Sequence, residues 1–202
     1  MKKLLAVFLG LLLVFGIAYA EDAVSSATIR MEKLPDVESQ DNGILVVFFS
    51  PDDTVRAAAW TIAGALSADL FEIEPVEPYT ADDLNYYNAK SRSMVEMGNS
   101  GARPEIVALP EDLTAYHTVV LCYPIWGGQA PRIVSTFLEG VDLSGKTVIP
   151  FATSNSSGIG NSAKMLQALT DESVEWQEGT GIRKGATEED IRGWAGSLIT
   201  EE

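Results

Sequence analysis

The hydrophobic pattern of this chain consists of short, unbroken apolar runs that are separated by amphipathic and polar stretches. Apolar runs of this length, bounded by turn residues, are typical of strands buried on both faces of a parallel sheet. The runs that predict such strands are Ile44–Phe49, Thr118–Tyr123 and Lys146–Ala152. Asp69–Glu74 alternates like a strand near a sheet edge, and Ser173–Trp176 predicts a weaker strand.

Helices are predicted in the stretches between these strands. They are an alanine-rich segment from about Asp53 to Leu66, then Pro131–Leu138 and Asn161–Leu169, and a last helix capped by Thr187. The connection over residues 75–111 is long, with one helix or a few turns inside it. About five strands in roughly 160 residues, separated by helices, predict a doubly wound α/β domain with a parallel sheet. Its ligand is expected outside the carboxyl ends of the strands.

The first twenty residues predict export. They contain two lysines and an apolar run that ends in Ala18-Tyr19-Ala20, which is the pattern of a secretory signal peptide cleaved after Ala20. The alternative is an uncleaved membrane anchor, but an apolar run of about 15 residues is short for a span. Residues 21–42 are polar and aperiodic and predict a flexible spacer before a domain over residues 43–202. We therefore expect a periplasmic, extracellular or cell-envelope protein without stable membrane insertion after processing.

Charge and composition exclude several classes of function. The chain has 14 basic and 29 acidic residues and a net charge of −15, which becomes about −17 without the two lysines of the leader. Such a surface repels nucleic acid and anionic membranes, so neither is an expected partner. The single cysteine, Cys122, allows no internal disulfide and lies in an apolar strand, where core packing is expected. The only histidine, His117, is expected at the surface rather than in catalysis. One histidine and one cysteine are too few for a zinc site and do not indicate a Cys-His nucleophile pair.

Two loops after the predicted strands contain groups that could bind a ligand. In "YPIWGGQAPR" (Tyr123–Arg132), a flat ligand could stack on Trp126 and accept hydrogen bonds from the peptide groups of Gly127 and Gly128. Equally, Trp126 could pack under the loop while the glycines only shape the turn. In "TSNSSGIGNS" (Thr153–Ser162), hydroxyl, amide and peptide groups could form a polar cradle, or an ordinary turn that caps the next helix.

Several segments together resemble the flavodoxin-like family of FMN-binding proteins, in particular the short flavodoxins that carry a Tyr-Pro-Ile-Trp loop. The segments are "ILVVFFS", "ADLFEIEPVEPYT", "SRSMVEM" with "ARPEI", "YPIWGGQAPRIVSTFLEGVDLSGKTVIPFATS", "SGIG" and "GATEEDIRGW", and they span about Ile44 to Leu198. The resemblance implies a five-stranded parallel sheet of order 2-1-3-4-5 with helices on both faces. It also implies FMN at the carboxyl edge, with low-potential electron transfer or quinone-type reduction.

The same resemblance assigns cofactor-binding residues in three loops. The expected contacts are Ser50, Thr54 and Val55 with the phosphate, Pro124, Ile125, Trp126, Gly127 and Gly128 with the isoalloxazine, and Thr153, Ser154, Asn155 and Gly158 with the polar edge and ribityl chain. Trp126 is the expected stacking partner. The family's Trp-Trp-Gly is Trp126-Gly127-Gly128 here, one aromatic fewer, and its Ser-Gly-Gly-Ser-Gly has become the segment 154–158. Both changes leave flavin binding possible.

The first loop departs most from the family pattern. Ser-x-Thr-Gly-Asn-Thr, which wraps the FMN phosphate, is replaced by Ser50-Pro51-Asp52-Asp53-Thr54-Val55. Pro51 has no N–H, and either aspartate can cap the helix in place of a phosphate. Each carboxylate also repels a phosphate about 5 Å away by roughly 3 kcal/mol per unit charge at an effective dielectric constant near 20. Arg56 and the Thr54 hydroxyl could offset part of this, and the loop could instead re-form around FMN with the aspartates turned outward.

Two functional hypotheses follow. In the first, an exported flavodoxin-like protein binds FMN and transfers electrons with a redox partner protein or a small quinone-like substrate. In the second, an FMN-deficient relative serves as a binding or accessory module that holds another flat ligand, such as riboflavin or a quinone, or none. Export in an unfolded state favours the second, because FMN loaded in the cytosol would be lost.

Overall fold

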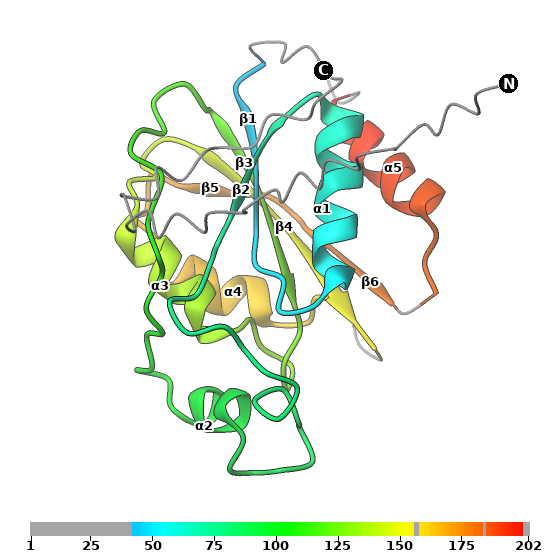
Figure 1. Ribbon diagram of the computed structural model, residues 1–202. Coiled ribbons are helices and arrows are strands. Elements are labelled where there is room, and N and C mark those ends of the chain that lie inside the picture. The colour runs from blue at the N-terminus through cyan, green and yellow to red at the C-terminus, as the bar shows by residue number, and fades with distance from the viewer. Residues whose placement is uncertain (1–41, 156–157, 184, 200–202) are drawn as a thin grey trace, which may run out of the picture.

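The fold is a parallel sheet with helices on both faces, as the apolar pattern predicts (Figure 1). The computed structural model describes residues 42–155, 158–183 and 185–199. Its strands are β1 (Ile44–Phe48), β2 (Asp69–Glu72), β3 (Thr118–Pro124), β4 (Thr147–Ser154), β5 (Glu175–Trp176) and β6 (Thr180–Arg183). Its helices are α1 (Asp53–Leu66), α2 (Arg92–Gly98), α3 (Arg132–Gly140), α4 (Ser162–Gln167) and α5 (Glu188–Ser197). The predicted leader and nearly all of the predicted spacer lie outside the described residues, which contain no helix long and apolar enough to cross a membrane.

All pairings between these strands are parallel, and the strand order is β2-β1-β3-β4-β5, with β6 also paired to β4. This confirms the order 2-1-3-4-5. The alternation of side chains along β1 explains the two layers of helices. Val46 and Phe48 face α1 and α5, whereas Leu45 and Val47 face α3 and α4 on the opposite side. Both layers are visible in Figure 1.

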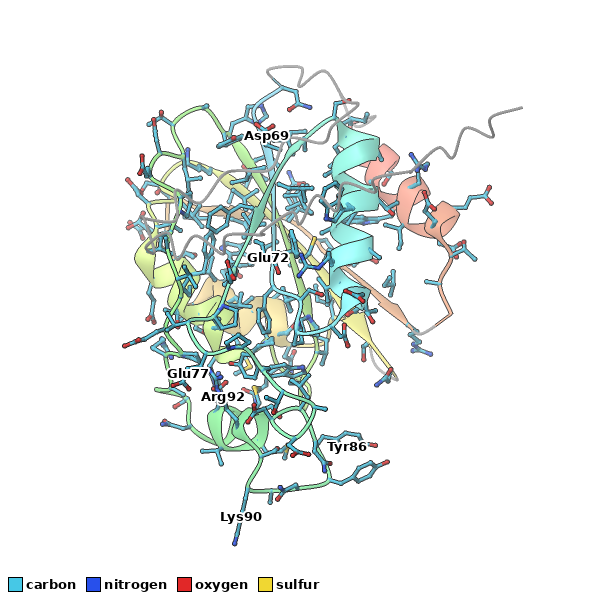
Figure 2. All side chains as sticks on the ribbon, viewed as in Figure 1. Asp69, Glu72, Glu77, Tyr86, Lys90 and Arg92 are labelled. Carbon is cyan, nitrogen blue, oxygen red and sulfur yellow. The ribbon has the colours of Figure 1, made fainter. Side chains whose placement is uncertain are left out.

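The connection between β2 and β3 is long, as expected, and holds a single helix, α2. It extends beyond the carboxyl edge of the sheet, and Tyr86 and Lys90 lie at its far end (Figure 2). A hydrogen bond from Arg92 to the Glu77 carbonyl fixes α2 to the start of the connection, and within α2 the same arginine forms an ion pair with Glu96. The start of α2 is therefore held beside the first residues of the connection.

The last strand position of the sheet is divided into β5 and β6, and the sequence pattern did not predict β6. The partners of β4 advance from Trp176 opposite Val148 to Thr180 opposite Phe151, so the outer strand has one extra residue over this stretch. Pro150 of β4 lies at this point and has no N–H to donate to a neighbouring strand. The break is thus a β-bulge at the place where the ladder loses a donor.

Gly179 within the bulge should tolerate no side chain. An added Cβ would lie 2.1 Å from the Pro150 carbonyl oxygen and 2.4 Å from its Cγ. We expect Gly179→Ala to destabilise the protein by about 1–3 kcal/mol, because backbone atoms must move to admit the methyl group. Gly193→Ala is the matched control, since its Cβ meets nothing within 4 Å in α5, and it should stabilise by about 0.5–1 kcal/mol. Urea unfolding measures both, and equal effects would contradict the close approach at Gly179.

Candidate functional site

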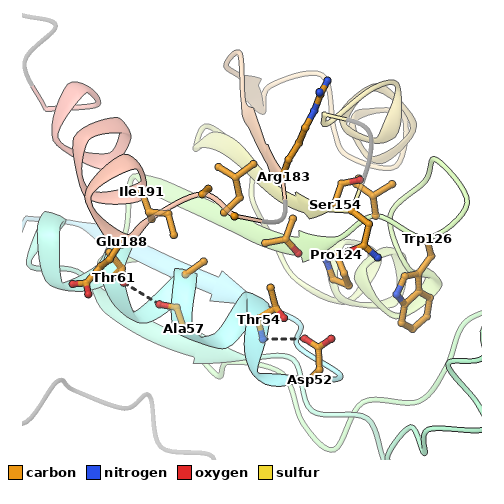
Figure 3. Close-up of a pocket in the computed structure, with 17 residues that line it drawn as sticks. Asp52, Thr54, Ala57, Thr61, Pro124, Trp126, Ser154, Arg183, Glu188 and Ile191 are labelled. Atoms are coloured by element: carbon orange, nitrogen blue, oxygen red, sulfur yellow. Dashed lines mark hydrogen bonds between the residues drawn. The ribbon is translucent and has the colours of Figure 1, made fainter.

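A cavity of about 590 Å³ lies at the carboxyl edge of the sheet (Figure 3). Its walls come from α1, from the residues that end β3 and β4, and from the connection between β6 and α5. The lining residues are Asp52, Thr54, Ala57, Ala58, Thr61, Pro124, Ile125, Trp126, Thr153, Ser154, Asn155, Ile182, Arg183, Gly185, Ala186, Glu188 and Ile191. The cavity therefore combines an apolar wall with hydroxyl, amide and charged groups. A concave site of this kind is the usual form of a small-molecule binding site.

The structure brings together residues from all three loops that the sequence singled out. Among the expected cofactor-binding residues, those that line the cavity are Thr54, Pro124, Ile125, Trp126, Thr153, Ser154 and Asn155. Ser50, Gly127, Gly128 and Gly158 are not among the lining residues. The side chain of Val55 is fully buried against the sheet, because the period of α1 places it on the same face as Ala59 and Ile62. It therefore does not face a ligand in the cavity.

Five further lining residues, at the end of β6 and the start of α5, were not predicted to contact a ligand. Ile182, Arg183, Gly185 and Ala186 follow a strand that was not predicted, and Glu188 appeared only as part of a helix start. Their signals in the sequence are a position near the last strand, at the edge where ligands of α/β proteins bind, and, for three of them, membership of the segment "GATEEDIRGW".

The loop after β3 is a tight turn built on two glycines. The N–H groups of Trp126 and Gln129 each donate to the carbonyl oxygen of the other residue, at 2.9 and 3.0 Å. Gly127 and Gly128 between them have φ angles of +53° and +81°, as both central residues of a type I′ turn require. The glycines thus shape the turn, as one of the two interpretations of this loop expected.

Trp126 is held by two other aromatic rings. Its ring lies edge-on to Tyr79, with centroids 5.3 Å apart, and to Phe49, with centroids 5.8 Å apart. Tyr79 is fixed in turn by the Arg92 guanidinium, 4.0 Å above its ring, and by the hydrogen bond that it donates to Glu96 at 2.7 Å. Burial, followed by this hydrogen bond to Glu96, raises the pKa of Tyr79 well above its usual range. The orientation of Trp126 is therefore determined without a ligand.

The N-terminus of α1 is capped by the chain itself. The Asp52 carboxylate accepts a hydrogen bond from the Thr54 N–H at 2.9 Å, and this bond is visible in Figure 3. The Ser50 hydroxyl accepts from the Arg56 N–H at 2.9 Å and donates to the Asp52 carbonyl. The Arg56 guanidinium forms two hydrogen bonds of 2.5 and 2.6 Å with Glu72 of β2. The capping role expected for an aspartate is thus confirmed, and Asp52 fills it.

Cys122 and His117 lie where the sequence pattern predicts them. Cys122 is completely buried in the core, and this burial raises the pKa of its thiol. His117 is exposed beside the start of β3, at the edge of the sheet opposite the cavity. No group of acidic, histidine or cysteine side chains in the described part of the chain could hold a metal ion.

A family model described as flavodoxin matches residues 43–198. A protein from Bacteroides eggerthii that is provisionally named a flavoprotein is 43% identical, with a TM-score of 0.71 over 79% of this chain and 98% of that chain. Another provisional flavoprotein, from Bacteroides uniformis, is 42% identical, with a TM-score of 0.71 over 75% of this chain and 96% of that one. A flavoprotein from Lactobacillus acidophilus in complex with FMN shares the fold, at 16% identity and a TM-score of 0.55 over 67% of this chain and 90% of that one. Among curated proteins, none matches at a significant level.

Substitutions at Gly127 test the type I′ turn beside Trp126. Gly127→Ala should destabilise the protein by about 1–2 kcal/mol, because this is the conformational free-energy cost of placing an L-residue with a side chain in the left-handed region. The added Cβ has open space around it, so steric overlap cannot be the cause. Gly127→Asn is the matched control, because Asn-Gly is the preferred pair for this turn, and it should cost less than half as much. Urea unfolding compares them, and an equal loss in both variants would argue against the turn type.

Proposed function

Because this chain belongs to the flavodoxin family, we propose that it binds a flavin in the cavity at the carboxyl edge of the sheet. We propose further that it exchanges electrons with a redox partner protein or reduces a small quinone-like substrate. The observation that carries this proposal is a pre-oriented Trp126 in the wall of a cavity that also presents polar groups of the β4 loop. The fold shared with a flavoprotein solved in complex with FMN supports a flavin as the ligand.

The residues present fit the ring system of a flavin. Pro124, Ile125 and Trp126 supply a rigid, largely apolar wall against which an aromatic ring can pack. Thr153, Ser154 and Asn155 lie at the end of the neighbouring strand, where Thr153 pairs with Pro124, and they offer hydroxyl, amide and peptide groups for the polar edge of the ring. A bound flavin supplies the one- and two-electron chemistry, and the protein tunes its potential through hydrogen bonds and charges near the ring. The chain itself binds, orients and shields the ring from water.

The site of action that we propose is outside the cytoplasm. The first twenty residues have the charge, apolar length and small residues of a secretory signal peptide. Such a protein would acquire its flavin after export, since a chain that crosses a membrane unfolded carries no cofactor with it. The partner that fits best is then a soluble electron carrier or a small quinone-like molecule, because the strongly acidic chain repels nucleic acid and anionic lipid.

Replacement of Trp126 tests flavin binding at this cavity. Trp126→Ala should weaken flavin binding at least about tenfold, because it removes both apolar contact area and ring stacking. Trp126→Phe should retain most of the affinity, and Trp176→Phe, on β5 and outside the cavity lining, should leave it unchanged. Loss of flavin fluorescence on titration measures each affinity. Tight binding by Trp126→Ala would exclude this site, and absence of binding by the wild type would favour the binding or accessory module.

Processing of the leader is tested on the secreted protein. Expressed in an export-competent bacterial host, the protein should be found outside the cytoplasm with Glu21 as its first residue, which N-terminal sequencing detects. The double substitution Ala18→Arg and Ala20→Arg should leave the precursor uncleaved, because the processing site requires small side chains at these two positions. Tyr19→Leu lies between them and should be processed normally. Retention of the wild-type leader would favour a membrane anchor.

A further inference from the structure

We infer that the cavity selects a flavin without a phosphate, of which riboflavin is the simplest, over the phosphate monoester FMN. This inference rests on the proposed function and specifies the ligand of the same site. It follows from the charges and hydrogen-bond donors that the described residues present to the cavity. A phosphate needs N–H donors and positive charge, and helix N-termini are the usual source of both in α/β proteins.

At the first helix N-terminus at the cavity, that of α1, two N–H donors are bound by side chains of the protein itself. Asp52 accepts from the Thr54 N–H, Ser50 accepts from the Arg56 N–H, and Pro51 has no N–H to offer. Asp52 is itself a lining residue. A phosphate at this position would therefore meet the Asp52 carboxylate and compete with it for the Thr54 N–H.

The second helix N-terminus at the cavity, that of α5, is also capped by side chains of the protein. The Thr187 hydroxyl and the Asp190 carboxylate form a capping box in which each side chain accepts from the backbone N–H of the other residue, at 3.2 and 2.8 Å. The next residue, Glu188, lines the cavity and pairs with Arg192 of the same helix at 2.7 Å. Both helix starts therefore bring an acidic side chain to the cavity.

The described lining residues contain fewer basic than acidic side chains. Arg56, which could have offset the aspartates, is directed to Glu72 on β2 and is not among the lining residues. Of the described residues that line the cavity, Arg183 is the one that is basic. It lies across the cavity from Asp52, with its side chain directed away from α1 (Figure 3). Among the described lining residues, Asp52 and Glu188 thus accompany one guanidinium, which disfavours a dianion.

The same groups suit a neutral polyol chain. A carboxylate accepts strong hydrogen bonds from hydroxyl groups, and Asp52 has an oxygen in addition to the one that caps Thr54. Further along α1, the hydroxyls of Thr54 and Thr61 lie among the small apolar residues Ala57 and Ala58. The ribityl chain of riboflavin carries hydroxyl groups and no charge, so it can pair with these side chains where a phosphate would be repelled.

Titration of the purified protein with riboflavin and with FMN tests the inference. At low salt, about 20 mM, riboflavin should bind at least about tenfold more tightly than FMN, as loss of flavin fluorescence reports. At about 500 mM salt the difference should narrow through stronger FMN binding, because salt screens the repulsion. Riboflavin binding should not depend on salt.

Two matched pairs of variants identify the carboxylates responsible. Asp52→Asn removes the charge but keeps an oxygen that can cap Thr54, so FMN should bind about fivefold to tenfold more tightly. Riboflavin should gain no affinity, because its ribityl hydroxyls lose a charged acceptor. Asp53→Asn is its control, because Asp53 lies next in the sequence with a fully exposed side chain outside the lining. Glu188→Gln should act like Asp52→Asn, and its control is the exposed Glu189→Gln. Circular dichroism verifies that each variant is folded.

The outcomes separate this inference from the proposed function. Wild-type protein that binds FMN as tightly as riboflavin, or more tightly, would overturn the inference and leave the flavin site in place. An unchanged ratio of the two affinities in Asp52→Asn would overturn it as well. Binding of neither flavin by the wild type would remove the proposed function, and the inference with it.

Discussion

The parallel pairing of β3 with β4 is the interaction on which the rest of the molecule depends. Seven residue pairs, from Thr118 opposite Thr147 to Pro124 opposite Thr153, hold the two strands in one register. This register ends both strands at the same level, so the turn that carries Trp126 and the polar loop after β4 begin side by side. The hydrogen bond from the Ile125 N–H to the Thr153 carbonyl, at 2.8 Å, extends the pairing into the loops themselves. The cavity is therefore a direct product of strand register.

The parts of the fold that were predictable are those with a strong local signal. Apolar runs are buried by any fold of this class. The helix α1 begins and ends at the predicted residues, because Asp52 caps its N-terminus and Ser67, in the left-handed region, ends it. β6 escaped prediction because "TGIR" has neither a continuous apolar run nor a clear alternation. It is a strand only because β4 offers a free edge beyond Pro150, and a partner strand is information that a local pattern does not contain.

The candidate site was predictable as three loops but not as a cavity. Residues such as Trp126 and Thr153 were identified because their types and their positions after strands have chemical meaning. The contribution of Arg183 and Glu188 depends on how the bulge in the outer strand directs β6 toward the sheet edge, which no spacing in the sequence reveals. At the start of α1, helix capping and anion binding compete for the same N–H groups. The Asp52 carboxylate already binds the Thr54 N–H, so helix capping occupies this donor before any ligand is present.

A buried arginine adds a further consequence for the site. The Arg132 guanidinium donates to the carbonyl groups of Glu96 and Met97, at the end of α2, and at 2.8 Å to the side chain of Gln129 in the turn after Trp126. Burial lowers the pKa of this group, yet its carbonyl partners at a helix C-terminus are the ones that a cation favours. The long connection that holds α2 is thereby fastened to the binding turn. The conformational entropy of this connection is lost during folding. A ligand that reaches Trp126 therefore binds a preorganised surface, and its affinity is little reduced by the entropy of ordering that surface.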